Sequence, residues 1–300
     1  MGNNIWSKNV QGILMLDLSR EIRFRDDRKD LFLNILGLKE GMTVVDVGCG
    51  PGAITRKLSN WLGDKTKIIG IDRDTTFINY AKEKAKEQNM YNISYLEGDA
   101  LKLPLEDNSV DACMSHTVIE HVPNKEFLLE QKRVCKPNGR VSVMCARPNK
   151  YIKTEPKLLP KQSEREKKLL DKLFKGTDEI FKKYNVGKYS VDPVELPTLF
   201  DELGFKDIQV DGIAIPVAID DARNSYKEKV IIVETQKEQL LEVVSMGLYQ
   251  NKSGLSDKEE KELKQLIEER FHKRLELIKD RKYIWDYTIF LLQVVSGMVD

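Results

Sequence analysis

The chain has 300 residues, enough for one large domain or two of ordinary size. Its composition, 41% hydrophobic and 32% charged, is typical of a soluble globular protein and excludes a fibrous, collagen-like or wholly disordered chain. Lys and Arg number 49 against 48 Asp and Glu, so the net charge is +1. No overall field would attract nucleic acid or an anionic membrane, which counts against a polynucleotide substrate.

The cysteines and apolar stretches bear on where the protein resides. Four cysteines show no CxxC spacing, which predicts reduced thiols and a cytoplasmic protein. The first residues lack the basic and apolar regions of a signal peptide. The most apolar stretch, residues 284–299, is interrupted by polar residues and is shorter than the roughly 20 residues of a spanning helix. We therefore expect no membrane segment.

Residues 1–36 are predicted to form an N-terminal helical lid segment, and residues 37–150 an α/β core. Short apolar runs in the core alternate with amphipathic stretches, which predicts a parallel sheet with helices on both faces. The expected strands are 43–47, 67–72, 93–97, 111–115 and 140–145. The expected helices are 53–62, 75–88, 101–106 and 125–135.

Beyond residue 150 the pattern indicates two insertions. Residues 151–190 are basic, with a helix expected from Ser163, and residues 217–283 include a helix from the capping box at Ser256 to about Ile278. Between and after them the core resumes. The expected core elements are a helix over 193–203 closed by Gly204, a strand over 205–215 within residues 191–216, and a last strand over 287–295 within residues 284–300.

The most informative segment is a strand that runs into a glycine-rich loop opening a helix, Val44-Val45-Asp46-Val47-Gly48-Cys49-Gly50-Pro51-Gly52. Glycines let the backbone approach a ligand closely. A plain tight turn and a dinucleotide-binding loop both fit the glycines, since Gly48, Gly50 and Ala53 match GxGxxG/A. Asp46, two residues before Gly48, favours a ligand carrying an ammonium group over a pyrophosphate.

This Asp-x-Gly-x-Gly-x-Gly motif resembles the first motif of the class I S-adenosylmethionine-dependent methyltransferases, of the small-molecule, UbiE-like type. Asp72 follows Gly52 by 20 residues, where a carboxylate can accept both ribose hydroxyls, although NAD would suit it equally. The run Gly98-Asp99-Ala100 matches the family's adenine-binding motif. Cys135 and Asn138 depart mildly from the family's pattern around Lys136-Pro137.

The resemblance implies a Rossmann-like sheet of seven strands, mostly parallel with an antiparallel edge strand, and lid insertions. It also implies S-adenosylmethionine as cofactor, with S-adenosylhomocysteine as product. The expected cofactor-binding residues are Asp46, Gly48, Cys49, Gly50, Gly52, Asp72, Arg73, Gly98, Asp99, Ala100, Ser115 and His116.

His116 is the candidate catalytic residue, as a base or an acceptor contact, with a loop histidine that only shapes the pocket as the alternative. His121 is expected to be structural, and no metal site is expected because the two histidines lack a third ligand. Residues 6–25 and 151–189 are hypothesised to form a lid. The lid would bring Trp6, Tyr184 and Tyr189 to the acceptor, with core aromatics as the alternative.

The sequence thus predicts a cytoplasmic methyltransferase that acts on a small-molecule acceptor by in-line displacement, with the acceptor and the oligomeric state left open. One alternative is a methyltransferase acting on RNA or protein, against which stand the balanced charge and the lack of an RNA-binding appendage. Another is a protein that binds S-adenosylmethionine or NAD without catalysis.

Overall fold

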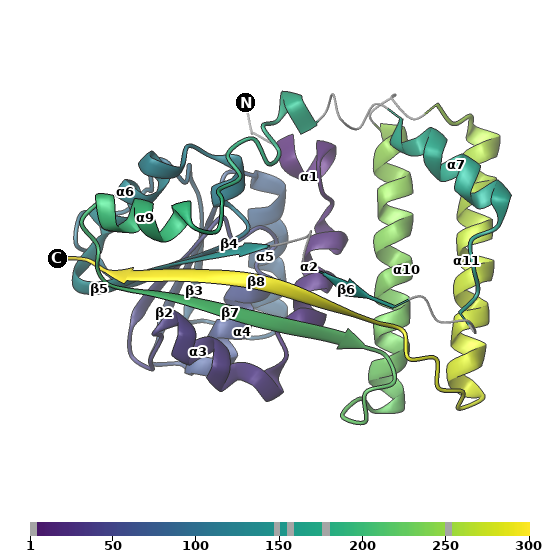
Figure 1. The fold of residues 1–300 in the computed structure, drawn as a ribbon, viewed down its shortest axis with the longest axis horizontal. Coiled ribbons are helices and arrows are strands. Elements are labelled where there is room, and N and C mark those ends of the chain that lie inside the picture. The colour runs from purple at the N-terminus through teal and green to yellow at the C-terminus, as the bar shows by residue number, and fades with distance from the viewer. Residues whose placement is uncertain (1–4, 147–150, 155–158, 176–180, 250–253) are drawn as a thin grey trace.

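The computed structural model describes residues 5–146, 151–154, 159–175, 181–249 and 254–300. Its centre is one sheet in which five strands run parallel in the order β3-β2-β1-β4-β5 (Figure 1). β8 follows β5 and is antiparallel to it, and β7 pairs with the outer side of β8. The strands are β1 (Thr43–Val47), β2 (Lys67–Asp72), β3 (Ile93–Glu97), β4 (Val110–His116), β5 (Cys135–Ala146), β7 (Lys206–Ala218) and β8 (Tyr287–Met298).

This arrangement confirms the expected Rossmann-like, mostly parallel sheet. A two-residue strand, β6 (Ile152–Lys153), adds an eighth member by pairing with the first part of β8. β1, β2 and β3 have the predicted bounds, because each is a short apolar run ended by a turn signal.

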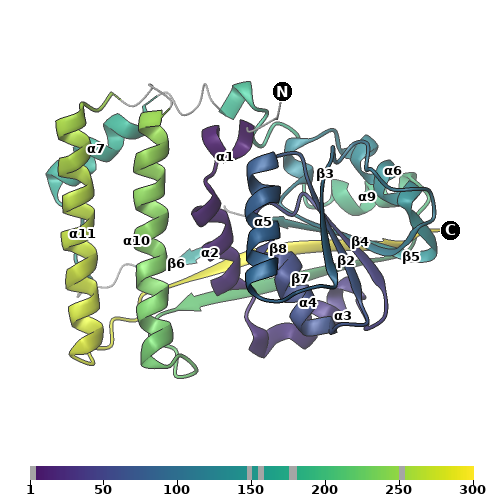
Figure 2. The same cartoon turned by 180° about the vertical axis from the view of Figure 1, so that it is seen from behind.

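Helices cover both faces of the sheet, as the alternation predicts. The apolar sides of α6 (Asn124–Val134) and α9 (Glu195–Glu202) share one core with the sheet, centred on Phe127 and Phe200. On the other face, α3 (Lys29–Leu36) and α4 (Ala53–Leu62) bury Phe32 and Leu58. α5 (Thr75–Glu87) packs on β2 and β3. In the view from behind, α4 and α5 stand together in front of the sheet (Figure 2).

The later segments form a helical layer beside the sheet. α7 (Glu164–Phe174), α10 (Tyr226–Tyr249) and α11 (Asp257–Lys279) share an apolar core with the last residues of β7. In both views α10 lies between α11 and α2 (Ile13–Arg23), and it contacts both (Figures 1 and 2). α10 also reaches the start of α2, where the Glu242 carboxylate accepts the N–H groups of Leu14 and Met15 at 2.9 and 2.6 Å.

Two expectations about helices need correction. Residues 101–106 form no helix, because Pro104 interrupts the segment and the Asp99 side chain accepts the Leu101 N–H at 2.9 Å in a turn. Residues 217–283 were expected to form a helical insertion, but the bounds of α10 within it were not predicted, since it packs against neighbours on two sides and its apolar residues are not confined to one stripe. The capping box at Ser256 is confirmed at the start of α11. None of the helices described is long and apolar enough to cross a bilayer.

Candidate functional site

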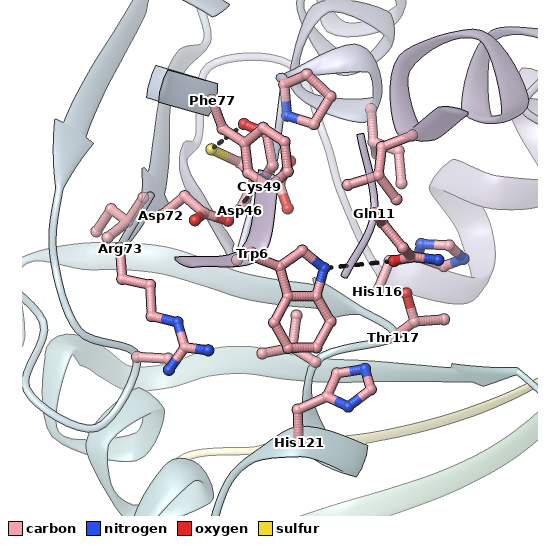
Figure 3. Close-up of a pocket in the computed structure, with 18 of the residues that line it drawn as sticks. Trp6, Gln11, Asp46, Cys49, Asp72, Arg73, Phe77, His116, Thr117 and His121 are labelled. Atoms are coloured by element: carbon pink, nitrogen blue, oxygen red, sulfur yellow. Dashed lines mark hydrogen bonds between the residues drawn. The ribbon is translucent and has the colours of Figure 1, made fainter. Parts of the chain in front are cut away.

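A cavity lies at the carboxyl ends of β1, β2 and β4, where parallel strands of such a sheet place ligand sites. It encloses about 950 Å³, including the part open to solvent. Its lining comes from the loop after β1, from the residues after β2, β3 and β4, and from α1 (Ile5–Asn9) and α2 (Figure 3). Residues of α1 and α2 therefore cover the cavity at the carboxyl edge of the sheet.

The loop after β1 has a conformation that requires glycine. Gly48 has a φ of +72°, and a Cβ at this residue would lie 2.4 Å from a methyl carbon of Val118. Both the Gly48 and Cys49 N–H groups donate to the Ile71 carbonyl, at 2.7 and 3.0 Å, which ties the loop to β2. Gly52 precedes α4 as an N-cap without a side-chain hydrogen bond. Ala53 and Ile54, the first residues of α4, line the cavity, so the helix start lies where it could receive a carboxylate.

Two carboxylates form the acidic part of the cavity. Asp72 accepts the N–H groups of Gly50 and Asp74, both at 2.9 Å, and Asp46 accepts the Thr55 hydroxyl at 2.7 Å. Burial raises the pKa of each carboxyl to about 6. Among the described residues, no Lys or Arg nitrogen lies within 4.0 Å of either carboxylate. The site thus holds buried acid groups without a protein counter-ion, which suits a cationic ligand with hydroxyl or ammonium donors.

The turn after β3 brings Gly98, Asp99 and Ala100 to the same cavity. The Gly98 N–H donates to the Asp72 carbonyl at 3.0 Å, and a Cβ on Gly98 would lie 2.7 Å from the Pro104 ring. Asp99 is exposed and lines the cavity, and its carboxylate accepts the Leu101 N–H at 2.9 Å.

α1 closes the cavity from the N-terminal side. The Trp6 ring lies 4.7 Å from the His121 ring, and its Nε1 donates to the Gln11 Oε1 at 3.4 Å (Figure 3). The Ser7 N–H donates to the Asp74 carboxylate at 2.7 Å, which fastens α1 to the segment after β2. The Arg73 guanidinium lies 5.7 Å from the Trp6 ring. Trp6 is thereby held in the lining of the cavity, and its role in a lid over the acceptor stays a prediction.

Two histidines lie at the end of β4 and just after it, His116 as the last residue of the strand and His121 in the following turn, and both are neutral. Burial, with the positive charges of Arg20 and Arg23, holds the pKa of His116 well below its usual value. The His116 ring packs edge-on against Phe24 with centroids 5.2 Å apart. Burial lowers the pKa of His121 to about 4, and its Nδ1 accepts the Gly187 N–H at 2.9 Å. The proton of neutral His121 therefore resides on Nε2.

The sequence matches the methyltransferase-domain family over residues 38–190, just over half of the chain. The chain belongs to this family.

The chain is similar to several named methyltransferases. Demethylmenaquinone methyltransferase of Oceanobacillus iheyensis is 30% identical over 139 residues, 46% of this chain and 57% of the relative. The Staphylococcus aureus enzyme of the same name is 37% identical over 107 residues, 35% of this chain and 44% of the relative. The aligned segment thus spans about half the length of these relatives. A Haemonchus contortus phosphoethanolamine N-methyltransferase 2 shares the fold, with a TM-score of 0.55, 17% identity, and coverage of 100% of this chain and 60% of that one.

Most of the residues predicted to bind the cofactor line the cavity. They are Asp46, Gly48, Cys49, Gly50, Asp72, Arg73, Gly98, Asp99, Ala100 and His116. Gly52 and Ser115 do not. Gly52 lies beneath the loop, where a Cβ would meet the Tyr95 hydroxyl at 2.5 Å, and Ser115 is fully buried within β4.

Two of the predicted substrate residues, Tyr184 and Tyr189, are not among the described residues that line the cavity. The Tyr189 N–H donates to the Glu120 carbonyl at 3.0 Å and its carbonyl accepts the Asn124 side chain at 3.1 Å. The segment around Tyr189 therefore packs against the loop after β4, and its Gly187 N–H donates to the His121 ring. The tyrosine roles stay predictions.

Several residues that line the cavity were not predicted as site residues from the sequence. Gln11, Arg20, Thr117 and His121 all reach the cavity. Arg20 stands among the many charged residues of 20–30, where no spacing separates a ligand-binding arginine from a solvated one. The positive φ of Thr117, +54°, is a structural sign of a functional position that no sequence pattern shows.

Proposed function

We propose that this protein is an S-adenosylmethionine-dependent methyltransferase that modifies a small molecule. The observation that carries the proposal is a pair of carboxylates, the buried Asp46 and the half-buried Asp72, which lie beside the glycine loop without a Lys or Arg partner in the described chain. A ligand that combines an ammonium, a sulfonium and a ribose diol supplies the donors and positive charge that this pair lacks. A dinucleotide would instead bring a pyrophosphate toward Asp46.

Each of these residues would bind a different part of the cofactor. Asp72 would accept the ribose hydroxyls, and Asp46 would face the ammonium, directly or through water. The uncapped start of α4, after Gly52, would receive the carboxylate. Asp99 would accept the adenine amino group, and Cys49 would pack against the ligand beside the loop.

The cofactor supplies an electrophilic methyl group, whose bond electrons return to sulfur as the acceptor's lone pair forms the new bond. The protein's part is to align the two reactants and to exclude water. Trp6 covers the site, and the neutral His116 imidazole can receive a proton when the acceptor is a hydroxyl or a similar acid. The Nε2–H of His121 can donate a hydrogen bond to a bound group.

Enclosure of the site favours a small acceptor over RNA or protein. α1 is fastened across the cavity by the contacts of Trp6 and Ser7, so a polymer would have to displace it. The curated relatives are named for methylation of demethylmenaquinone, which is also a small molecule. A cytoplasmic location is part of the proposal, supported by four cysteines that are all buried thiols.

Calorimetric titration with S-adenosylhomocysteine and with NAD tests the proposal. We expect S-adenosylhomocysteine to bind and NAD not to bind. Asp72→Ala should weaken binding by about a hundredfold, because two charge-assisted hydrogen bonds are lost. The exposed Asp64, which lies beyond the end of α4, offers Asp64→Ala as a matched control. Preferential binding of NAD would overturn the proposal. Transfer of label from the cofactor to the RNA or protein fraction of an extract would overturn its small-molecule part.

A further inference from the structure

Two arginines of α2 stand near the acceptor side of the cavity without a counter-ion. Arg20 lines the cavity, and its guanidinium donates to two hydroxyls, those of Ser19 at 2.8 Å and Thr117 at 3.4 Å. The Nε of Arg23 is buried without a hydrogen-bond partner in the described chain. Its guanidinium lies 3.9 Å from the centre of the Phe290 ring.

The acids on and near α2 are already bound elsewhere. Asp17 accepts Arg56 at 2.6 Å and the Tyr80 hydroxyl at 2.9 Å. Glu21 is paired with Lys57 at 3.2 Å, and the Glu242 carboxylate accepts two N–H groups at the start of α2. Within the described ranges, no carboxylate lies within 4.0 Å of Arg20 or Arg23. Two neighbouring half-buried guanidinium groups with no carboxylate partner are unfavourable, and an anionic ligand would relieve that cost.

Other groups around Arg20 also favour an anion. Burial and the neighbouring Arg23 lower the pKa of Arg20 to about 9, so the guanidinium is still charged at neutral pH. His116 is neutral and adds no competing negative charge. Thr117 is β-branched and is held at a φ of +54° while its N–H donates to the Met144 carbonyl at 2.9 Å. Such strain at a cavity wall indicates a side chain placed for a ligand.

The two charged parts of the cavity lie on opposite sides. In the close-up, Asp72 and Asp46 stand on one side of Trp6, and His116 and Thr117 on the other (Figure 3). Arg20 belongs to the second side through its bond to Thr117. The acidic side suits a cationic methyl donor, so the basic side is left for the acceptor.

We infer that Arg20 and the Thr117 hydroxyl form a seat for an oxyanion, with Arg23 adding positive charge nearby, and that the methyl acceptor is a small molecule carrying a carboxylate or a phosphate. The inference about the acceptor rests on the proposed function, whereas the anion seat itself does not. The planar guanidinium fork fits either oxyanion with paired hydrogen bonds.

The first experiment measures anion binding directly. Protein with and without S-adenosylhomocysteine is titrated by calorimetry with inorganic phosphate, with acetate and with neutral acetamide. We expect at least one anion to bind and acetamide not to bind, and the two anions decide which oxyanion is preferred. Arg20→Gln should weaken anion binding at least about tenfold, while Arg73→Gln, at the acidic side, should change it less than about twofold.

Further variants guard against a folding effect. Arg20→Lys keeps the charge but loses the fork, so its anion affinity should lie between those of the native protein and Arg20→Gln. Thr117→Val should weaken anion binding without removing charge. Binding of S-adenosylhomocysteine to the Arg20 and Thr117 variants, within about twofold of the native protein, shows that the fold is intact. The inference is overturned if neither anion binds. It is also overturned if Arg73→Gln loses anion affinity and Arg20→Gln does not.

The second experiment tests the acceptor. Labelled cofactor is incubated with a small-molecule extract, and the products are separated on an anion-exchange column at pH 8. Labelled product retained by the column supports the inference, and label confined to the unretained fraction overturns it while leaving methyl transfer established. If S-adenosylhomocysteine does not bind but phosphate or acetate does so through Arg20, the proposed function fails and the anion seat stands.

Discussion

The indole ring of Trp6 and the imidazole ring of His121 lie with their centroids 4.7 Å apart and their planes at 57°. This contact joins the first helix of the chain to the loop after β4, and both residues line the cavity. His121 is itself held by the Gly187 N–H, so three distant segments meet at one ring pair. Closure of the site thus depends on a contact that is separate from the glycine loop.

Removing that contact should loosen the cofactor. Trp6→Ala is expected to weaken S-adenosylhomocysteine binding about five- to tenfold, since an aromatic pair contributes roughly 0.5–1.5 kcal/mol beyond the area it buries. The effect should appear mainly as faster dissociation in stopped-flow measurements. Trp6→Phe keeps a ring against His121 and should recover most of the affinity. Equal dissociation rates for native and Trp6→Ala protein would show that α1 does not close the site.

The glycine loop gives a second prediction, which separates the free-energy cost of a strained backbone from that of a steric clash. Gly41 and Gly48 both have positive φ, +87° and +72°, but only Gly48 has a close neighbour, Val118. Gly41→Ala should cost about 1–2 kcal/mol of unfolding free energy from its conformation alone. Gly48→Ala should cost more and should also reduce S-adenosylhomocysteine binding. Similar effects of the two substitutions on binding would contradict a close approach of the loop to the ligand.

The pKa of Asp46 predicts how stability depends on pH. Its folded value, about 6, lies above the ordinary 3.8, so the folded state binds more protons in that window. The stabilising contribution of this carboxyl is therefore fully present below pH 3.8 and lost as the pH rises to about 6. The loss is on the order of 3 kcal/mol.

Asp46→Asn should remove that part of the pH dependence and raise the melting temperature of the ligand-free protein above pH 6.5. The amide can still accept the Thr55 hydroxyl, so packing is preserved. Affinity for S-adenosylhomocysteine should fall in the variant, and in the native protein it should increase as the pH rises from 5 to 7. Melting curves across pH, with and without the ligand, check both statements. A lower melting temperature for the variant at pH 7.5 would contradict the assignment.

His116 gives a prediction about turnover. His116→Ala is expected to lower kcat about a hundredfold while changing the Kd of S-adenosylhomocysteine less than about threefold, because general base catalysis typically contributes 10²–10⁴-fold. His272, exposed on α11, offers His272→Ala as a control that removes an imidazole far from the cavity. Because the pKa of His116 is well below its usual value, the acid limb of kcat should not lie near 6.5. Unchanged turnover in His116→Ala would show that this side chain only shapes the wall of the cavity.

The parts of the site that could be predicted from the sequence are those that depend on residues close to one another in the chain. Asp46, Gly48 and Asp72 could be predicted because a strand, a tight loop and the next strand end are set by neighbouring residues. The pairing of Arg20 with Thr117 could not, since the two are 97 residues apart and depend on how α2 packs against α4 and α10. Tyr184 and Tyr189 were selected for their chemistry, whereas the backbone bonds of Tyr189 place this segment behind His121.

The carboxylate of Glu242 at the start of α2 connects the last third of the chain to its beginning. A Cβ on Gly12 would overlap that carboxylate, so the two segments fit each other closely. On the proposed function, we expect substitutions in α10 to change acceptor preference, although no residue of α10 is among the described residues that line the cavity. Homologous enzymes that exchange the segment between β7 and β8 would acquire a new support for Arg20 while keeping the same methyl-donor site, which is one route by which a common core can serve different acceptors.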